Sequence, residues 1–230
     1  MLSYLLSFQK GFLMNIIKLD QNFQRICFLG DVHGLFKELD MFLKLNKPNI
    51  VLQCGDFGYW PKFFKDRFDY LKDNPIPIYF CDGNHEDYES LKNIECEVYP
   101  NIYYMKRTKI LNINNLNIMF IGGAESIDGN MRTLGYDYFL EESISQKDFI
   151  NLPDTKIDII ISHTCPMEVN IKRYNEKQSS RIALSYILEM YQPKLWYFGH
   201  YHSFKEGNYK NTKWFCLDML PRDNCFIWLK

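Results

Sequence analysis

The sequence predicts an α/β protein whose core contains parallel strands. Two short apolar runs, 25–31 and 49–56, both end in Gly-Asp, which is typical of a buried strand that ends at a loop. The segment between them repeats apolar residues at helical spacing. A third apolar run at 76–84 follows another helical segment. We therefore expect consecutive βαβ units with right-handed crossovers.

The helices of the first half are predicted from their own patterns. Between the first two strands, five apolar side chains share one helical face: Leu35, Phe36, Leu39, Phe42 and Leu43. The next helix is expected over 61–73, because Pro61 stands where a first helical turn tolerates proline.

The second half changes character after the third strand. Segment 101–123 alternates loosely around an Asn-Asn turn, which predicts antiparallel strands. Segment 124–143 carries Gly and charge without a steady period, so we predict a long loop of functional importance. The remaining expected elements are a strand at 156–163, a helix at 181–192 with Leu184, Ile187, Leu188 and Tyr191 inward, and strands in KLWYFGH, KWFCLDM and CFIWLK.

Length and composition favour one soluble domain. A chain of 230 residues suits a single domain, and no repeat or linker divides it. We expect residues 1–24 to be an N-terminal extension and lead-in, with Met14 as an alternative start. Residues 25–230 then form the domain, with 124–143 as its active-site loop. No stretch resembles a signal peptide or a membrane span, so we expect a cytoplasmic protein without a membrane partner.

Charge and cysteine content narrow the function classes further. The net charge of −1 provides no general basic field for duplex nucleic acid, and Lys106 and Arg107 are expected to be solvated charges. The seven cysteines include no CxxC pair and are expected to be reduced thiols in the core, which indicates a reducing compartment.

All five histidines, and several other polar residues, directly follow predicted strands. In chain order the set is Asp31, His33, Asp56, Asn84, His85, His163, His200 and His202. Each signal alone is commonplace, since Asp-x-His and a histidine at a strand end are usually structural. Together they provide oxygen and imidazole ligands without thiolate, which suit Mn, Fe, Zn or similar divalent ions. Seven candidates besides His85 are enough for two ions that share one carboxylate.

These residues resemble the calcineurin-like metallophosphoesterase family, whose motifs run GDxHG, GDxx, GNHE/D, a lone His and GHxH. This chain reads GDVHG, GDFGYW, GNHE, SHT and GHYH over about residues 25–220. The resemblance implies a four-layer αββα sandwich with two mixed sheets flanked by helices. It also implies a dinuclear centre of manganese, with iron, zinc, nickel or magnesium as alternatives. By position, Asp56 bridges the two ions, with Asp31, His33 and His202 on one and Asn84, His163 and His200 on the other.

The resemblance also implies a mechanism, in which a metal-bound hydroxide attacks phosphorus in line and His85 protonates the leaving group. Many members orient that histidine with an Asp three residues after the bridging one, and the Ser/Thr phosphatases add an Arg. Here Tyr59 and Trp60 stand at those positions, which disfavours a protein phosphatase. Asp82 and Glu86 are the nearby candidates for orienting His85.

The predicted loop contains GGAESIDGNMR, which resembles GGAxSxDxxxR in a small subgroup of these enzymes, many of them in bacteria and phages. The forked guanidinium of Arg132 suits phosphate, so we predict substrate contacts from Arg132, Asp128 and Tyr59. A salt bridge from Arg132 to Asp128 or Glu125 is the equally supported alternative.

We therefore expect a metal-dependent phosphoric ester hydrolase. Near-neutral charge favours a phosphomonoester, small phosphorylated molecule or nucleotide as substrate. The alternative is a phosphodiesterase or nuclease acting on cyclic nucleotides or single-stranded nucleic acid, with Tyr136, Tyr138 and Phe139 stacking a base or only packing the loop. A non-catalytic binding module, as in a retromer subunit with degraded ligands, is disfavoured because all seven positions keep competent residues. The oligomeric state stays open.

Overall fold

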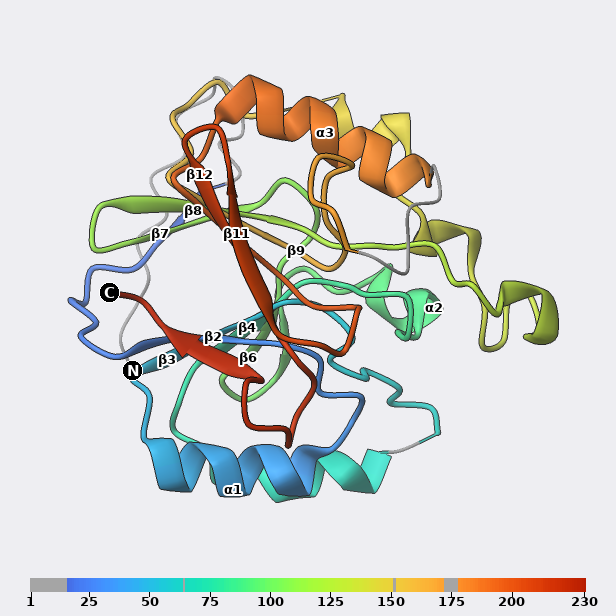
Figure 1. Ribbon diagram of the computed structural model, residues 1–230. Helices are drawn as coiled ribbons and strands as arrows, with labels where there is room; N and C mark the ends of the chain where they lie inside the picture. Colours follow the sequence, from blue (N-terminus) through green and yellow to red (C-terminus); the bar gives the residue numbers. More distant parts are fainter. Residues whose placement is uncertain (1–15, 64, 151, 172–177) are drawn as a thin grey trace, which may run out of the picture.

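Two β-sheets face each other at the centre of the protein, and each carries a helix on its outer side (Figure 1). The computed structural model describes residues 16–63, 65–150, 152–171 and 178–230. Helix α1 (Phe36–Asn46) covers one sheet and α3 (Ser179–Tyr191) covers the other. The four-layer αββα arrangement implied by the family resemblance is confirmed.

The sheet beside α1 contains the predicted βαβ units. Its strand order is β13 (Phe226–Trp228), β2 (Ile26–Leu29), β3 (Ile50–Gln53), β4 (Ile78–Phe80), β6 (Ile102–Tyr104) and β5 (Glu97–Tyr99). The four inner strands are parallel, whereas both edge strands are antiparallel to their neighbours. β2, β3 and β4 are buried throughout, which explains their continuous apolar runs.

The sheet beside α3 is also mixed. Its order is β1 (Ile16–Lys18), β7 (Ile110–Ile113), β8 (Leu116–Ile121), β9 (Ile159–Ser162), β10 (Leu195–Phe198), β12 (Thr212–Cys216) and β11 (Lys205–Tyr209). β8, β9, β10 and β12 run parallel, while β7 and β11 form antiparallel hairpins with β8 and β12. Asn114 and Asn115 close the first hairpin with φ angles of 52° and 63°, as its turn type requires.

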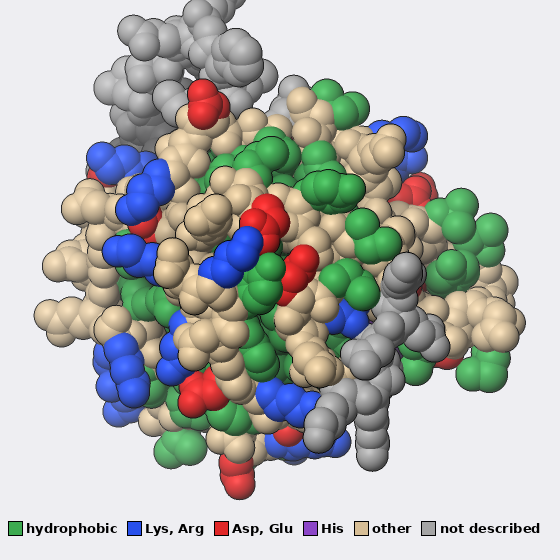
Figure 2. Space-filling model, turned by 45° about the horizontal axis from the view of Figure 1, so that its top comes forward, with side chains coloured by type: hydrophobic (Ala, Val, Ile, Leu, Met, Phe, Trp, Pro, Cys, Tyr) green, Lys and Arg blue, Asp and Glu red, His purple; other side chains and the backbone are tan. Residues whose placement is uncertain are grey.

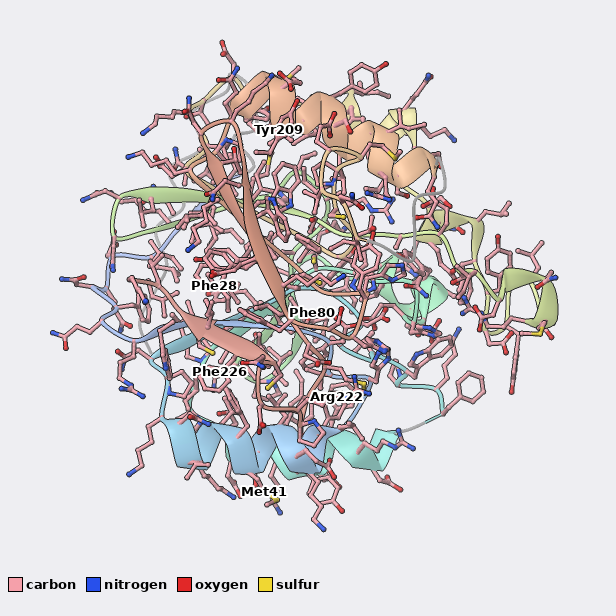
Figure 3. The ribbon with its side chains drawn as sticks, in the orientation of Figure 1. Phe28, Met41, Phe80, Tyr209, Arg222 and Phe226 are labelled. Carbon is pink, nitrogen blue, oxygen red and sulfur yellow. The ribbon has the colours of Figure 1, made fainter. Side chains whose placement is uncertain are left out.

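Aromatic and aliphatic side chains fill the space between the layers. Phe28 of β2, labelled between the two sheets in Figure 3, is one example. Its ring stacks on that of Tyr197 of β10 with centroids 3.6 Å apart, so it joins the two sheets directly. On the other side of the first sheet, Phe226 packs against Phe42 of α1 at 5.0 Å. Met41, on the opposite face of α1, is exposed, as the helical pattern predicts.

Several expectations need correction. The helix predicted over 61–73 is a 3₁₀ helix, η1 (Lys65–Leu71). Segment 101–123 contains the predicted antiparallel hairpin in β7 and β8, but its first strand, β6, belongs to the other sheet and pairs in parallel with β4. The short elements β5, β11 and α2 (Tyr88–Leu91) were not predicted.

The division of the chain into a lead-in and a domain also changes. The predicted lead-in contributes β1, which pairs in parallel with β7, so the domain begins before residue 25. The expectation for Met14 lies outside the described residues. Among the helices described, none is long and apolar enough to cross a bilayer. All seven cysteines are free thiols, and six of them are buried.

Candidate metal centre

The predicted ligands converge because their loops leave the carboxyl ends of parallel strands. Asp31 and His33 follow β2, Asp56 follows β3, and Asn84 follows β4. In the second sheet, His163 follows β9, while His200 and His202 follow β10. Parallel strands end at the same edge of their sheet, and the two sheets bring these edges together, as α/β proteins usually do at their sites.

One group of ligand atoms forms around Asp31. The Asp31 Oδ2 atom lies 2.9 Å from His202 Nε2 and 3.6 Å from His33 Nε2. The two imidazole Nε2 atoms are only 3.0 Å from each other. Two imidazole nitrogens and a carboxylate oxygen that converge on one place match the donor set of a divalent cation.

A second group forms around His163. Its Nδ1 lies 2.9 Å from the carbonyl oxygen of Cys54, which can only accept, so Nδ1 carries the ring's hydrogen. In the neutral ring Nε2 then carries a lone pair, and this nitrogen faces Asn84 Oδ1 at 3.1 Å and Asp56 Oδ2 at 3.4 Å. In this neutral form of the ring, three acceptors would face one another, and a cation between them would satisfy all three.

Asp56 lies between the two groups. Its Oδ2 is 3.4 Å from His163 Nε2 and 3.7 Å from His33 Nε2, while Oδ1 accepts from the His85 backbone N–H at 2.8 Å. The ligand atoms of Asp31, Asp56 and His163 all lie within 4.8 Å of one another, as do those of the Asp31 group. The His200 ring lies 4.9 Å from that of His163.

The backbone at these positions is held in an unusual conformation. His33, Asp56, His200 and His202 have φ angles of 51°, 51°, 69° and 44°, in the left-handed region that non-glycine residues rarely occupy. Such residues cluster at functional sites and persist because the surrounding fold holds them.

Two motif glycines make the close packing of the site possible. A Cβ at Gly199 would overlap Asp31 Oδ1, and a Cβ at Gly83 would overlap Asp56 Oδ1. The glycines of GHYH and GNHE are therefore required by the carboxylates that they face.

The electrostatics of the centre keep both carboxylates ionised. Burial alone raises the pKa of Asp31, but hydrogen bonds with His202 and His33 outweigh it and hold that pKa well below its usual range. Asp56 behaves in the same way, because the charge and hydrogen bond of His163 outweigh burial and lower its pKa. Two buried anions without their cation would be costly, which again fits a metal centre.

The two inner histidines are affected in opposite directions. Burial lowers the pKa of His163, but Asp56 and Asp31 outweigh burial and raise it to about 9. Burial and the neighbouring His163 lower the pKa of His200 to about 3, so its ring is neutral. Without metal, the proton on His163 therefore occupies the place that a cation would take.

His85 lies beside the cluster, and no carboxylate of the described residues is hydrogen-bonded to its ring. Its ring is 5.5 Å from that of His33, and burial lowers its pKa. Its backbone is fixed from two sides, because its N–H donates to Asp56 and its carbonyl accepts from Trp60 Nε1 at 2.9 Å. The ring therefore lies within reach of a group bound at the metal cluster.

Neither acidic residue expected to orient His85 is available. Glu86 accepts from the backbone N–H groups of Phe57 at 2.7 Å and Tyr59 at 2.6 Å, so it supports the loop after β3, and burial raises its pKa to about 8. Asp82 accepts from Tyr88 and from Arg107, with Arg107 Nη2 at 2.7 Å.

Arg107 is also not the solvated charge that was expected. Its side chain is only 10% exposed and pairs with Asp82 and Asp148. It therefore joins the end of β4 to the segment after the loop.

The three predicted substrate contacts have protein partners. The Tyr59 ring is buried against Phe68 and Phe80, with centroids 5.6 and 6.5 Å away, so it packs the core instead of lining an open site. Arg132 Nε lies 3.2 Å from Asp128, so the predicted salt bridge forms there. Glu125 instead accepts from Ser179 and Ser180 of α3.

Sequence reasoning missed four residues that support the centre. Ser126 accepts a hydrogen bond from the Asn84 side chain, and Glu142 accepts one from Ser126. Trp60 donates to the backbone carbonyl of His85. Arg222, which is labelled in Figure 3, donates to the carbonyl oxygen of His202 at 2.9 Å. Only Ser126 had a sequence signal, since it lies in the recognised GGAxS stretch.

The family model described as calcineurin-like phosphoesterase matches residues 24–204. The chain belongs to the calcineurin-like phosphoesterase family. A lariat debranching enzyme from Schizosaccharomyces pombe is 28% identical, in an alignment that covers 78% of this chain and 48% of that relative. The chain thus spans about half the length of this curated relative.

Solved structures support the same fold. The phosphopantetheinyl hydrolase of Mycobacterium tuberculosis aligns with a TM-score of 0.52 and 8% identity, covering 89% of this chain and 95% of that chain. GAP50, the anchor in the inner membrane complex of Plasmodium, aligns with a TM-score of 0.50 and 13% identity, covering 85% and 71%. Identities this low show the shared fold alone.

Proposed function

We propose that this family member is a two-metal phosphoester hydrolase. The observation that carries the proposal is the convergence of Nε2 and carboxylate atoms around Asp31 and around His163, with Asp56 between the two groups. We call the proposed ion at Asp31, His33 and His202 the first ion. The second ion is the one proposed at Asn84, His163 and His200.

The chain's own residues have distinct tasks in this proposal. A pair of divalent ions, when bound, supplies positive charge to a transferring phosphoryl group and makes water more acidic. Asp56 holds the two ion sites in register, because its Oδ2 faces His163 and His33. His85 protonates the leaving oxygen from the side of His33, with its backbone fixed by Asp56 and Trp60.

Two substrate classes compete, and the first is a phosphomonoester or small phosphorylated molecule. The net charge of −1 supports it. Positive and negative side chains both occur on the face drawn in Figure 2, in keeping with this near-neutral charge.

The second candidate is a phosphodiester of nucleic acid, and an aromatic surface beside His85 favours it. Trp60 donates a hydrogen bond from its Nε1 to the backbone carbonyl of His85. Its ring centroid lies 6.0 Å from that of Phe63, which lies 5.1 Å from that of Tyr136. Phe63 and Tyr136 are 45% and 57% exposed, so each presents aromatic surface to solvent, against which a base can pack. The similarity to a lariat debranching enzyme favours this candidate as well.

One hydrolysis screen tests both candidates. The manganese-loaded protein would be compared on p-nitrophenyl phosphate, bis-p-nitrophenyl phosphate, 2′,3′- and 3′,5′-cyclic nucleotides, single-stranded DNA and a 2′–5′ branched RNA. Higher kcat/KM on monoesters supports the first candidate, and higher kcat/KM on diesters supports the second. Metal-loaded protein that hydrolyses none of them would contradict the proposal.

A further inference from the structure

The side-chain amide of Asn84 has two chemically different ends, and only one of them suits a cation. Its Oδ1 faces His163 Nε2 at 3.1 Å, whereas its Nδ2 donates to Ser126 Oγ at 3.0 Å. A rotation of the amide by half a turn would direct two N–H groups at the metal cluster. The orientation of Asn84 therefore decides whether the position is a ligand.

The Ser126 hydroxyl determines this orientation through its single hydrogen. That hydrogen is donated to Glu142 Oε2, which lies 2.5 Å from Ser126 Oγ. Arg132 Nη2 also donates to Ser126 Oγ. With its hydrogen committed to Glu142, the Ser126 oxygen can only accept from Asn84, so it selects the nitrogen end of the amide.

Glu142 and Arg132 hold the hydroxyl in place. The Glu142 side chain is buried; its Oε1 accepts from the Phe139 N–H at 3.1 Å, and its Oε2 pairs with Arg132 Nη2 at 3.2 Å. Arg132 Nη1 donates to the backbone oxygen of Asn84 at 3.3 Å and to that of Asp137 at 2.7 Å. Arg132 thus contacts both the backbone of Asn84 and the group that orients its side chain.

We infer that Ser126, Glu142 and Arg132 are positioning residues that fix the Asn84 amide with its oxygen toward the second ion. We call these three residues the amide-orienting triad. The inference rests on the proposed two-metal function and gives the GGAESIDGNMR stretch a role, since Ser126 and Arg132 are its two side chains in the triad.

Manganese titration of the full chain, with metal content measured in parallel, tests the triad. We expect two ions to bind the wild-type protein. Ser126→Ala should lower the affinity for the second ion by about 10- to 100-fold, the usual effect of removing a residue that hydrogen-bonds to a metal ligand. The affinity for the first ion should stay unchanged. Ser126→Thr keeps the hydroxyl and should restore binding. Ser143→Ala is the matched control, because the hydroxyl of this loop serine has no partner among the described residues.

A second variant separates orientation from general damage to the loop. Aspartate has two equivalent oxygens, so Asn84→Asp no longer depends on which end of the side chain faces the metal. In the Ser126→Ala background, Asn84→Asp should recover the affinity for the second ion. The inference would be overturned if Ser126→Ala bound both ions with wild-type affinity. It would also be overturned if the double variant did not recover affinity for the second ion. A wild-type protein that binds no manganese would instead overturn the proposed function itself.

Discussion

The strand ends and the loop that overlies them contribute to the same centre in different ways. The strand ends carry the ligand side chains on buried backbone, and Asp31 and His163 are fully buried. Loop 124–143 projects from the body on the side of α2 and has little regular structure (Figure 1). Figure 2 shows hydrophobic side chains gathered at its right edge, the side on which the loop projects in Figure 1.

The difference teaches that placing ligands and orienting them are separate tasks. The hydrogen-bonded register of the parallel strands fixes where the backbone of each ligand residue lies relative to its neighbours. The loop then adds hydrogen bonds such as that from Asn84 to Ser126, which strand geometry alone does not provide. Changes at the strand ends should therefore abolish metal binding or chemistry, whereas changes at the loop side should weaken binding of the second ion or alter substrate selectivity without abolishing activity.

The largest effect is expected at the bridging position. Asp56→Asn removes a carboxylate whose Oδ2 faces both His33 and His163, so binding of both ions should be lost together with all activity. Metal content after manganese loading and gel filtration measures this. Asp69→Asn, an exposed carboxylate of η1, is the matched control and should bind like wild type. An Asp56→Asn protein with two ions would show that Asp56 is not the bridge.

Replacement of His85 should affect chemistry without affecting metal. Loss of a general acid costs about 10²- to 10⁴-fold in kcat, and the loss is smaller when the leaving group needs no proton. His85→Ala should therefore be much slower on an alkyl phosphate than on p-nitrophenyl phosphate, relative to wild type. If the metal content falls in this variant, or if kcat decreases by the same factor for both substrates, His85 is not the general acid.

The pH profile sharpens the same assignment. Burial lowers the pKa of His85 from its usual 6.5, and only the protonated ring can donate. The kcat for an alkyl phosphate should therefore fall as the pH rises through this lowered pKa. The profile of His85→Ala should lack that decrease. An identical decrease in both proteins would assign it to another group.

The smallest effect is expected at the aromatic surface on the loop side. If a base stacks there, Phe63→Ala should weaken the binding of a nucleic-acid substrate by ~1–3 kcal/mol, the usual range for one stacked base. The KM for p-nitrophenyl phosphate should stay unchanged. Tyr70→Ala provides the control, because this exposed aromatic belongs to η1. Equal KM values for Phe63→Ala and wild type on every nucleic acid would remove the support for the second candidate.

The strand-end residues could be predicted because their signals are local. Each one follows a short apolar run within a few residues, and neighbouring parallel strands end together, so the sequence order also indicates proximity. The same locality explains why the buried strands and the two long helices were found. The hydrophobic spacing of α1 and α3 is decided within each segment.

The loop side could not be predicted because its partners are distant in sequence. Ser126 contacts Asn84 across 42 residues, and Arg107 reaches Asp82 across 25. Neither separation has a periodic signal, so Arg107 was mistaken for a surface charge. Tyr59 was misread for a related reason, since only the packing of η1 and β4 shows that its ring belongs to the core.

An anomalous difference map of manganese-loaded crystals tests the central claim most directly. We predict two peaks, one beside Asp31, His33 and His202 and one beside Asn84, His163 and His200, with Asp56 between them. A map without peaks at these side chains, or with one peak that Asp56 does not touch, would contradict the two-metal centre.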